Sequence, residues 1–257
     1  MIEAKDSYDT HAQAWIERLH SGSNLAHSML EKPAMLVRTP DLTDKRVLAL
    51  GCGSAEEFAI FLARHARAAD LVGIDISAEL LECARQRFPE SAFLCRSIDH
   101  LGDFDDASFD FIYSSLTLHY LPGWLPLLQE AHRILSPGGS MLFSTHHPVK
   151  WGAQVQRGET ADTFRMGYIR PKQSAPVVHG DYLGTRHIED NWFNGSMPVS
   201  YYHRPLSAIM ADVLASGLQI REFAEPAPVA GTAALHPHFH AIHSRIPLFM
   251  IFDLVKP

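Results

Sequence analysis

The fold of this chain depends first on residues 46–55, which read Arg46-Val47-Leu48-Ala49-Leu50-Gly51-Cys52-Gly53-Ser54-Ala55. A short apolar run before two glycines at alternate positions predicts a buried strand that ends in a sharp turn. Glycines at such a turn let a ligand come against bare backbone. The first amides of the helix that follows then point at this ligand. The stretch therefore predicts a ligand site at the end of a strand.

A second apolar stretch, residues 71–75, predicts the next strand and ends in Asp75. A carboxylate at the end of the second strand of such a unit can accept both hydroxyls of a ribose. A dinucleotide fingerprint would require a third glycine at the position of Glu56. A carboxylate there would repel a pyrophosphate. The two stretches therefore predict a nucleotide-like cofactor that is not a dinucleotide.

The pattern Gly51-x-Gly53-x-Ala55, followed by Asp75, resembles the class I S-adenosylmethionine-dependent methyltransferases. The resemblance continues through residues 106–115 and 130–139 and covers roughly residues 45–146. It implies an α/β, Rossmann-like fold with a seven-stranded, mostly parallel sheet, helices on both faces and a cap insertion. It also implies S-adenosylmethionine as cofactor and S-adenosylhomocysteine as product. The family usually carries an acidic residue two positions before the first glycine, where it helps to hold the methionine amino group. This chain has Ala49 there, and Glu56, Glu57 or an N-terminal residue would have to compensate.

The resemblance assigns roles to residues at the ends of the predicted strands. Gly51, Cys52 and Gly53 would face the methionine end of the cofactor, and Asp75 the ribose. Ile76 would pack on the adenine, unless it is an ordinary core isoleucine. The backbone N–H of Ile98 would meet an adenine ring nitrogen, and Ser97 or Asp99 the exocyclic amine. The ends of parallel strands face the ligand crevice, so two further residues are expected to wall the methionine end: Ser114 and Leu116.

From residue 46 onward, strand-like and helix-like segments alternate, which is typical of a parallel sheet with right-handed crossovers. Ser77 is the expected N-cap of a helix over residues 77–88, and Gly217 the expected C-terminal glycine of a helix that starts at Pro205. In the resembled family the last strand is antiparallel and lies beside the fifth. The other expected helix covers residues 55–66, and the further strands cover 92–95, 109–114, 140–145, 218–224 and 248–255.

Residues 1–45 are expected to form a helical lid ahead of the methyltransferase domain, residues 46–257. Residues 6–20 look helical, and Tyr8 or Trp15 would cover the cofactor. The alternative is a helix that packs over the sheet edge. Pro33 and Pro40 are expected to break any long helix in residues 21–44.

Residues 146–204 interrupt the alternation and are rich in aromatic side chains, among them Trp151, Tyr168 and Trp192. Long segments of this kind are usually functional. We interpret this one as a cap that forms an aromatic substrate pocket. The alternative is that its aromatic residues only make a satellite core.

A general base is needed only if the acceptor loses a proton. His119, just after the fourth strand, is the first candidate, followed by His146 and, at the end of the cap, Tyr201. Each of them has a structural or substrate-orienting role as its alternative. Cys52 is interpreted as a small side chain rather than a nucleophile. Alternate histidines from His236 to His240 could converge on an extended strand, but no cysteine or carboxylate completes a ligand set, so no metal site is expected.

The composition of the chain narrows its class. Its 257 residues fit one domain with a sizeable insertion, and no apolar run is long enough for a membrane span. A formal net charge of −7 and a pI near 6.1 argue against nucleic acid as substrate. Three cysteines without a disulfide spacing favour the cytoplasm. A monomer or homodimer is expected.

The expected function is methyl transfer from S-adenosylmethionine to an O, N or C atom of a small molecule. The aromatic-rich cap suggests a planar, partly apolar acceptor such as a secondary metabolite. Three alternatives stay open. Glu56 argues against a nicotinamide-dependent oxidoreductase, and Ala49 argues for a non-catalytic binding or regulatory protein. The third is another reaction of the sulfonium, which product analysis would separate from methyl transfer.

Overall fold

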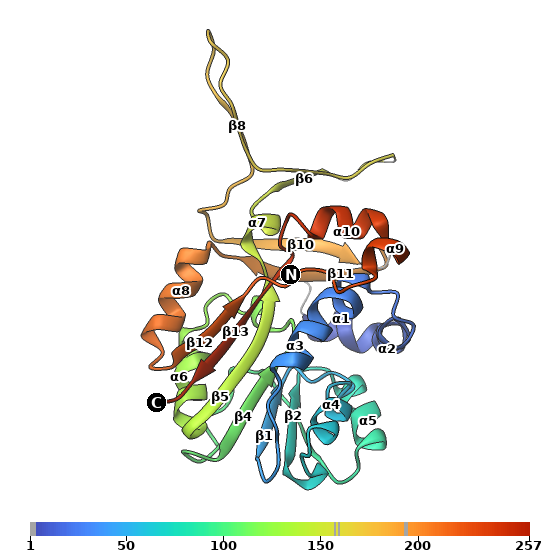
Figure 1. The fold of residues 1–257 in the computed structure, drawn as a ribbon, viewed down its shortest axis with the longest axis vertical. Helices are drawn as coiled ribbons and strands as arrows, with labels where there is room; N and C mark the ends of the chain where they lie inside the picture. The colour runs from blue at the N-terminus through green and yellow to red at the C-terminus, as the bar shows by residue number, and fades with distance from the viewer. Residues whose placement is uncertain (1–3, 157, 159, 193–194) are drawn as a thin grey trace.

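A seven-stranded sheet forms the centre of the molecule, with the strand order β12-β13-β5-β4-β1-β2-β3 (Figure 1). The computed structural model describes residues 4–156, 158, 160–192 and 195–257. The five strands from β3 to β5 run parallel, whereas β13 is antiparallel to both β5 and β12. The strands are β1 (Val47–Leu50), β2 (Leu71–Asp75), β3 (Ala92–Cys95), β4 (Phe109–Ser114), β5 (Leu135–His146), β12 (Gln219–Ala224) and β13 (Phe249–Val255). This architecture confirms the predicted fold, including the last strand beside the fifth.

Helices cover both faces of the sheet because successive strand residues point to opposite sides. Leu48 and Leu50 of β1 belong to one buried cluster, which also contains residues of α6 (Leu125–Ile134) and α8 (Leu206–Ala215). Val47 and Ala49 belong to the other cluster, together with residues of α3 (Lys32–Arg38), α4 (Phe58–Ala63) and α5 (Ala78–Arg87). Ala49 is 3% exposed and lies within this second cluster.

Several predicted element bounds agree with the structure, and others are wrong for identifiable reasons. Ser77 caps α5, with its hydroxyl accepting from the amide of Leu80 at 3.2 Å. The helix after the glycine turn is shorter than predicted because Ala55 has φ +59° and keeps residues 51–57 in turns. Strand β5 begins at Leu135 rather than at Ser140.

The N-terminal region is more helical than predicted. The expected helix over residues 6–20 is divided into α1 (Ala4–Thr10) and α2 (Ala12–His20). The expected break at Pro33 is wrong, because the π-helical turn η1 (His27–Glu31) continues directly into α3. Pro33 is the second residue of α3, directly after the π turn, so its missing N–H falls where the helical hydrogen-bond pattern changes. Single π turns within helices often mark functional sites.

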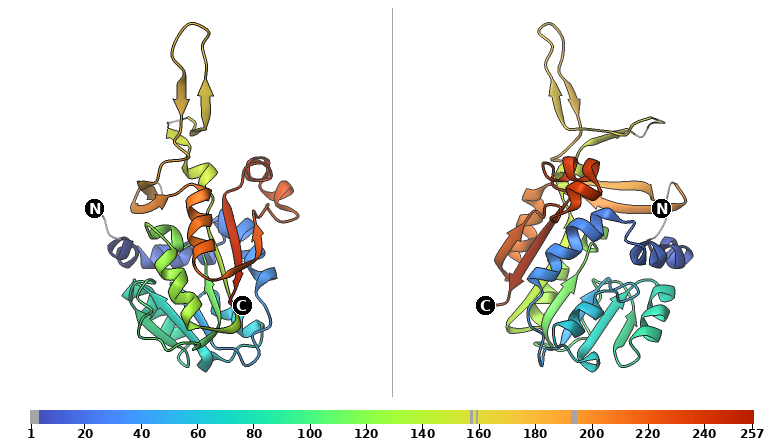
Figure 2. Two further views of the ribbon diagram at one scale, coloured as in Figure 1. Left: turned by 90° about the vertical axis from the view of Figure 1, so that its left-hand side faces the viewer. Right: turned by 45° about the vertical axis from the view of Figure 1, so that its right-hand side comes forward.

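The segment 146–204 divides into a part near the sheet and a part that projects from the molecule. The helix α7 (Pro148–Trp151) and the hairpin of β10 (Arg186–Trp192) and β11 (Met197–His203) lie across the carboxyl ends of the strands, close to α1. Two short ribbons extend away from the body (Figures 1 and 2). They are β6 (Gln154–Gln156) with β7 (Thr163–Arg165), and β8 (Gly167–Ile169) with β9 (Val177–His179). Only the first part can therefore cover a site at the sheet.

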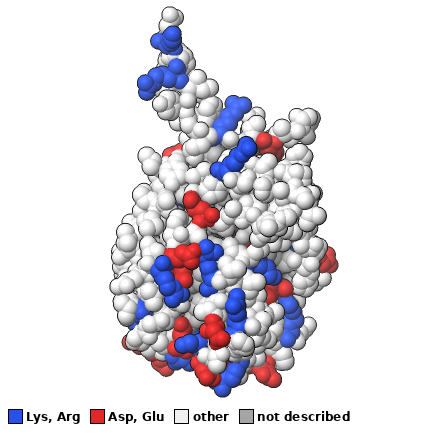
Figure 3. Space-filling view, in the orientation of Figure 1, with Lys and Arg blue, Asp and Glu red and all other residues white. Residues whose placement is uncertain are grey.

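The distribution of charged side chains and the helix formed by residues 237–243 complete the description of the fold. Basic and acidic side chains intermingle over the body of the molecule in Figure 3, whereas basic residues stand near the tip of the longer ribbon. Residues 236–240, considered as an extended histidine-rich strand, lie instead at the start of the helix α10 (Pro237–His243). None of the helices in the described part of the chain has the length and apolar character needed to span a membrane.

Candidate active site

A cavity of about 490 Å³ lies at the carboxyl ends of the parallel strands. Its volume is within the range of small-molecule and cofactor sites. The cavity brings together twelve residues that the sequence singled out: Tyr8, Trp15, Gly51, Cys52, Gly53, Asp75, Ile76, Ser97, Ile98, Leu116, His119 and His146. Their individual roles stay predictions. Three other predicted residues, Asp99, Ser114 and Tyr201, are not part of the lining.

The glycine turn after β1 fits a ligand approaching bare backbone. Gly51 has φ +68°, and a Cβ built on it would stand 2.3 Å from the hydroxyl oxygen of Thr117. The amides of Gly51 and Cys52 both donate to the carbonyl of Ile74, at 2.8 and 3.0 Å. The end of β2 thus fixes the glycine turn, whose residues line the cavity.

Asp75 connects this turn to the start of α5. Its Oδ2 accepts from the amide of Gly53 at 2.8 Å, and its Oδ1 from the amide of Ser77 at 2.9 Å. Burial raises the pKa of the carboxyl although these amides act in the opposite direction. The amides orient the carboxylate at the cavity wall, where its remaining lone pairs can accept from a diol.

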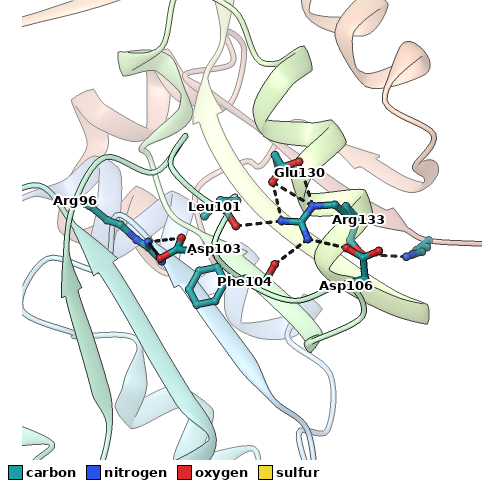
Figure 4. Close-up of polar contacts among 8 residues, drawn as sticks. Arg96, Leu101, Asp103, Phe104, Asp106, Glu130 and Arg133 are labelled. Atoms are coloured by element: carbon teal, nitrogen blue, oxygen red, sulfur yellow. Dashed lines mark hydrogen bonds and ion pairs between the residues drawn. The ribbon is translucent and has the colours of Figure 1, made fainter.

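The loop after β3 carries the residues expected at the adenine. Ser97 and Ile98 line the cavity, whereas Asp99 is exposed and outside it, so Ser97 is the better placed of the two polar candidates. Arg133 of α6 fixes this loop by donating to the carbonyls of Phe104 at 2.7 Å and Leu101 at 3.1 Å (Figure 4).

Two further arginine contacts hold the same loop, as Figure 4 shows. Arg133 also pairs with Asp106 and Glu130. Arg96 pairs with Asp103 and lies over the ring of Phe104, with its guanidinium carbon 4.7 Å from the centroid. The two arginines therefore anchor both the beginning and the end of the loop that reaches the cavity.

The segment after β4 positions the opposite wall of the cavity. Leu116 lines it and has φ +49°. Ser114, expected beside it, is fully buried, and its hydroxyl donates to the carbonyl of Leu50 at 2.9 Å. Ser114 thus connects β4 to β1 and does not form the wall.

His119 and His146 form a stacked pair at the cavity wall. Their ring centroids are 3.6 Å apart, with planes inclined by 13°. They are 3% and 9% exposed. Burial lowers the pKa of His119 to about 3, and burial together with His119 and Lys150 lowers the pKa of His146. Both imidazoles are therefore neutral near pH 7.

Three ring nitrogens of this pair are buried without a hydrogen-bond partner in the described part of the chain. They are both nitrogens of His119 and Nδ1 of His146. Buried polar groups are normally satisfied. A neutral imidazole offers one donor and one acceptor nitrogen, so the pair can orient a polar acceptor without charging.

Tyr201 supports the histidines from behind and does not reach the cavity. It is 1% exposed, and its hydroxyl donates to Asp190 at 3.1 Å. Its ring meets His119 and His146 edge-on, at centroid distances of 5.9 and 5.0 Å. The geometry gives it a packing role in this structure in place of the expected base.

Aromatic residues of the N-terminal helices meet the rest of the chain over the cavity. The hydroxyls of Tyr8 and Tyr120 are 2.7 Å apart. Trp15 stacks on Trp192 of β10, with centroids 5.9 Å apart and planes inclined by 17°. All four line the cavity. Of the cap aromatics, Trp151 also lines it, whereas Tyr168 on the projecting ribbon is 65% exposed.

A further group of ionisable residues lies at the cavity, and the sequence interpretation named only Glu57 among them. His27 and Glu57 line it, and the fully buried Glu31 lies beside them, with Oε2 2.9 Å from Nδ1 of His27. The spacing of four between His27 and Glu31 is a helical signal. The expected helix break at Pro33 kept this pair from being considered.

Comparison with known proteins places these features in context. The sequence profile of a family described as "Methyltransferase domain" matches residues 48–143. An uncharacterized protein of Haemophilus influenzae is 28% identical over 250 residues, which is 91% of either chain. A trans-aconitate 2-methyltransferase of Methylobacterium radiotolerans is 29% identical over 210 residues, 75% of either chain. The crystal structure of an S-adenosylmethionine-dependent methyltransferase from Mesorhizobium loti superimposes with a TM-score of 0.69 at 25% identity, covering 87% of this chain and 96% of that one.

Proposed function

Because this chain is a class I S-adenosylmethionine-dependent methyltransferase, we propose that it methylates an O, N or C atom of a small, planar acceptor held beside His119 and His146. The observation that carries this proposal is the stacked, neutral histidine pair, whose ring nitrogens have no partner among the described residues. A pair of this kind recognises a polar edge of an otherwise flat molecule.

The cofactor site is assigned from the cavity wall. Asp75 would accept the ribose hydroxyls, and the turn Gly51–Gly53 would bring bare backbone against the methionine end. Ile76, Ser97 and Ile98 would surround the adenine. When bound, S-adenosylmethionine supplies an electrophilic methyl group that a nucleophile displaces in line.

The main catalytic contribution of the protein would be to align the acceptor atom with the methyl group. Holding two reactants in an attack geometry can supply ~7–11 kcal/mol. With a pKa lowered to about 3, His119 is a weak base near neutral pH, so we assign His119 and His146 to orienting the acceptor by hydrogen bonds. Tyr201 and Trp151 pack against His146 and keep its ring in place.

The other residues that line the cavity indicate the shape of the acceptor. Trp151, Trp192 and Phe249 line the cavity and favour a flat, partly apolar molecule. Arg18 and Lys150 line it too and allow a carboxylate on the acceptor. The name of the Methylobacterium relative makes trans-aconitate a useful member of a test panel.

We also propose that residues 1–45 act as a lid over this site. The contacts that support it are the hydrogen bond of Tyr8 with Tyr120 and the stacking of Trp15 on Trp192. Both join the N-terminal helices to segments on the far side of the cavity. Cofactor and acceptor would enter while these contacts are open.

Calorimetric titration tests the cofactor site. Wild type should bind S-adenosylhomocysteine, with NAD as the negative control, and Asp75→Asn should bind it at least about tenfold more weakly, since hydrogen bonds to a charged group are lost. Affinity for NAD instead of S-adenosylhomocysteine would refute the assignment.

Transfer from isotopically labelled S-adenosylmethionine tests the acceptor site. The panel contains phenols, nitrogen heteroaromatics and small polycarboxylic acids. For an active acceptor, His146→Asn should raise KM while the affinity for S-adenosylhomocysteine stays unchanged. His147→Asn is the matched control, because His147 is buried next to the pair but does not line the cavity. Binding of the cofactor without transfer to any acceptor would favour the non-catalytic alternative.

A further inference from the structure

Two carboxylates and one imidazole lie at the cavity: His27 and Glu57 line it, and Glu31 contacts His27. Glu31 and His27 belong to the π-helical turn η1, and Glu57 immediately precedes α4. Glu31 is fully buried, and its Oε1 accepts from the hydroxyls of Ser115, at 2.9 Å, and Ser144. Ser115 directly follows β4, and Ser144 belongs to β5. The carboxylate is therefore held at the carboxyl ends of two strands of the sheet.

The charges of this group do not balance. Burial opposes the charging of His27, but the carboxylate of Glu31 outweighs it and raises the pKa of the imidazole. Burial raises the pKa of Glu57, against the effect of His27 and with that of Glu31. The effect of Lys32 on Glu57 is the smallest of these. With all three residues ionised, one negative charge is left over.

Glu57 carries this excess charge. Within the described part of the chain it takes part in no ion pair, in contrast to the neighbouring Glu56, whose carboxylate contacts Arg87 and His20. A desolvated carboxylate without a cationic partner is costly. Glu57 lines the cavity, so the cationic group of a bound ligand can reach it.

The excess charge lies next to the glycine turn. Burial is the main cause that raises the pKa of the Cys52 thiol and of Tyr113; Glu57 adds to both shifts, and Glu31 adds to that of Tyr113. Ala49 and Phe58, the neighbour of Glu57, belong to the same buried cluster. The start of α4 thus packs on the same side of the sheet as Ala49.

We propose that Glu57, supported by the Glu31–His27 pair, binds the α-ammonium group of the methionine part of S-adenosylmethionine. The ammonium supplies the one positive charge that the group lacks. In this chain a residue at the start of α4 and a pair on a π turn thus do what an acidic residue at the end of the first strand would otherwise do. The inference rests on the cofactor and not on the acceptor proposed above.

Paired titrations with two ligands test this subsite. The ligands are S-adenosylhomocysteine and its deamino analogue, in which hydrogen replaces the α-amino group. Glu57→Gln should bind S-adenosylhomocysteine about 10–100-fold more weakly, since a charged hydrogen bond is lost. Its affinity for the deamino analogue should equal that of wild type, which also shows that the site is folded. Glu82→Gln, at an exposed position of α5 outside the cavity lining, is the control and should change neither affinity.

Each result has one meaning. An unchanged affinity of Glu57→Gln for S-adenosylhomocysteine would overturn the subsite and leave the cofactor assignment intact. An equal loss for both ligands would also overturn it, because Glu57 would then act on the fold of the cavity and not on the ammonium. Failure of wild type to bind S-adenosylhomocysteine would overturn the cofactor assignment and the subsite together.

Discussion

Replacing His119 should flatten the dependence of folding stability on pH. The imidazole is 3% exposed and stacks on His146, and burial lowers its pKa from 6.5 to about 3. In the unfolded chain the same group titrates near its ordinary value. Between these two values the unfolded chain therefore holds one more proton at this position than the folded one, and acid favours unfolding.

The size of the effect follows from the two pKa values. The contribution of His119 to the free energy of unfolding is fully present above pH 6.5. It falls by ~1.4 kcal/mol for each pH unit below that value, until the folded pKa of about 3 is reached. At pH 5 the contribution of His119 is thus ~2 kcal/mol less than at pH 7.5. The pKa of His146 is also lowered and adds to the loss in wild type.

Urea unfolding at several pH values between 5 and 7.5, followed by tryptophan fluorescence, measures this effect. His119→Phe keeps an aromatic ring and should lose ~2 kcal/mol less than wild type over this range. The contributions of histidines that do not touch His119 are common to both proteins and cancel in the difference, whereas that of His146 changes because His119 lowers its pKa. The exposed His238 supplies the control variant, His238→Asn. Parallel curves for His119→Phe and wild type would refute the buried, neutral state of His119.

Three further substitutions probe the site and its supports. Gly51→Ala adds strain at positive φ and a Cβ 2.3 Å from a threonine hydroxyl, so it should destabilise the protein by ~1–3 kcal/mol in urea unfolding. Gly22→Ala has a similar φ but open space around the Cβ, so it should destabilise the protein less. Equal losses of stability in the two variants would contradict the clash with the threonine. Arg133→Met removes two bonds to loop carbonyls and should lower stability by ~1–3 kcal/mol and weaken S-adenosylhomocysteine binding, whereas an unchanged melting temperature would contradict this. Trp192→Ala removes the stacking on Trp15, worth ~0.5–1.5 kcal/mol, and should speed amide hydrogen exchange in α2; unchanged exchange would count against the lid contact.

Local sequence patterns were sufficient for the parallel strands and for the glycine turn at the end of β1. The run Val47–Leu50 with its glycines, and Asp75 at the end of the next strand, predict structures made within a few residues of chain. The hydroxyl of Ser77 caps α5 as its residue type indicates. These features depend on strand ends and helix starts, which have strong local signals.

The missed parts of the site depend on contacts between distant segments. Glu31 is held by Ser115 and Ser144, and no periodicity connects these three positions. Tyr201 looked like a base because it ends the cap, but the register of the β10–β11 hairpin places it behind the histidines. Ser114 was assigned by its position at a strand end, although strand alternation decides which neighbour faces the cavity.

The antiparallel strand β13 also determines the order in which the sheet can be completed. β12 has no partner in the sheet other than β13, and β13 pairs along its length with β5, which is more than 100 residues earlier in the chain. During synthesis, the parallel strands can assemble while this edge of the sheet is still open. Residues 219–224 must then wait, as an unpaired strand, until residues 249–255 have left the ribosome. The hydrophobic edge of β5 is the surface that a chaperone would have to protect in the meantime.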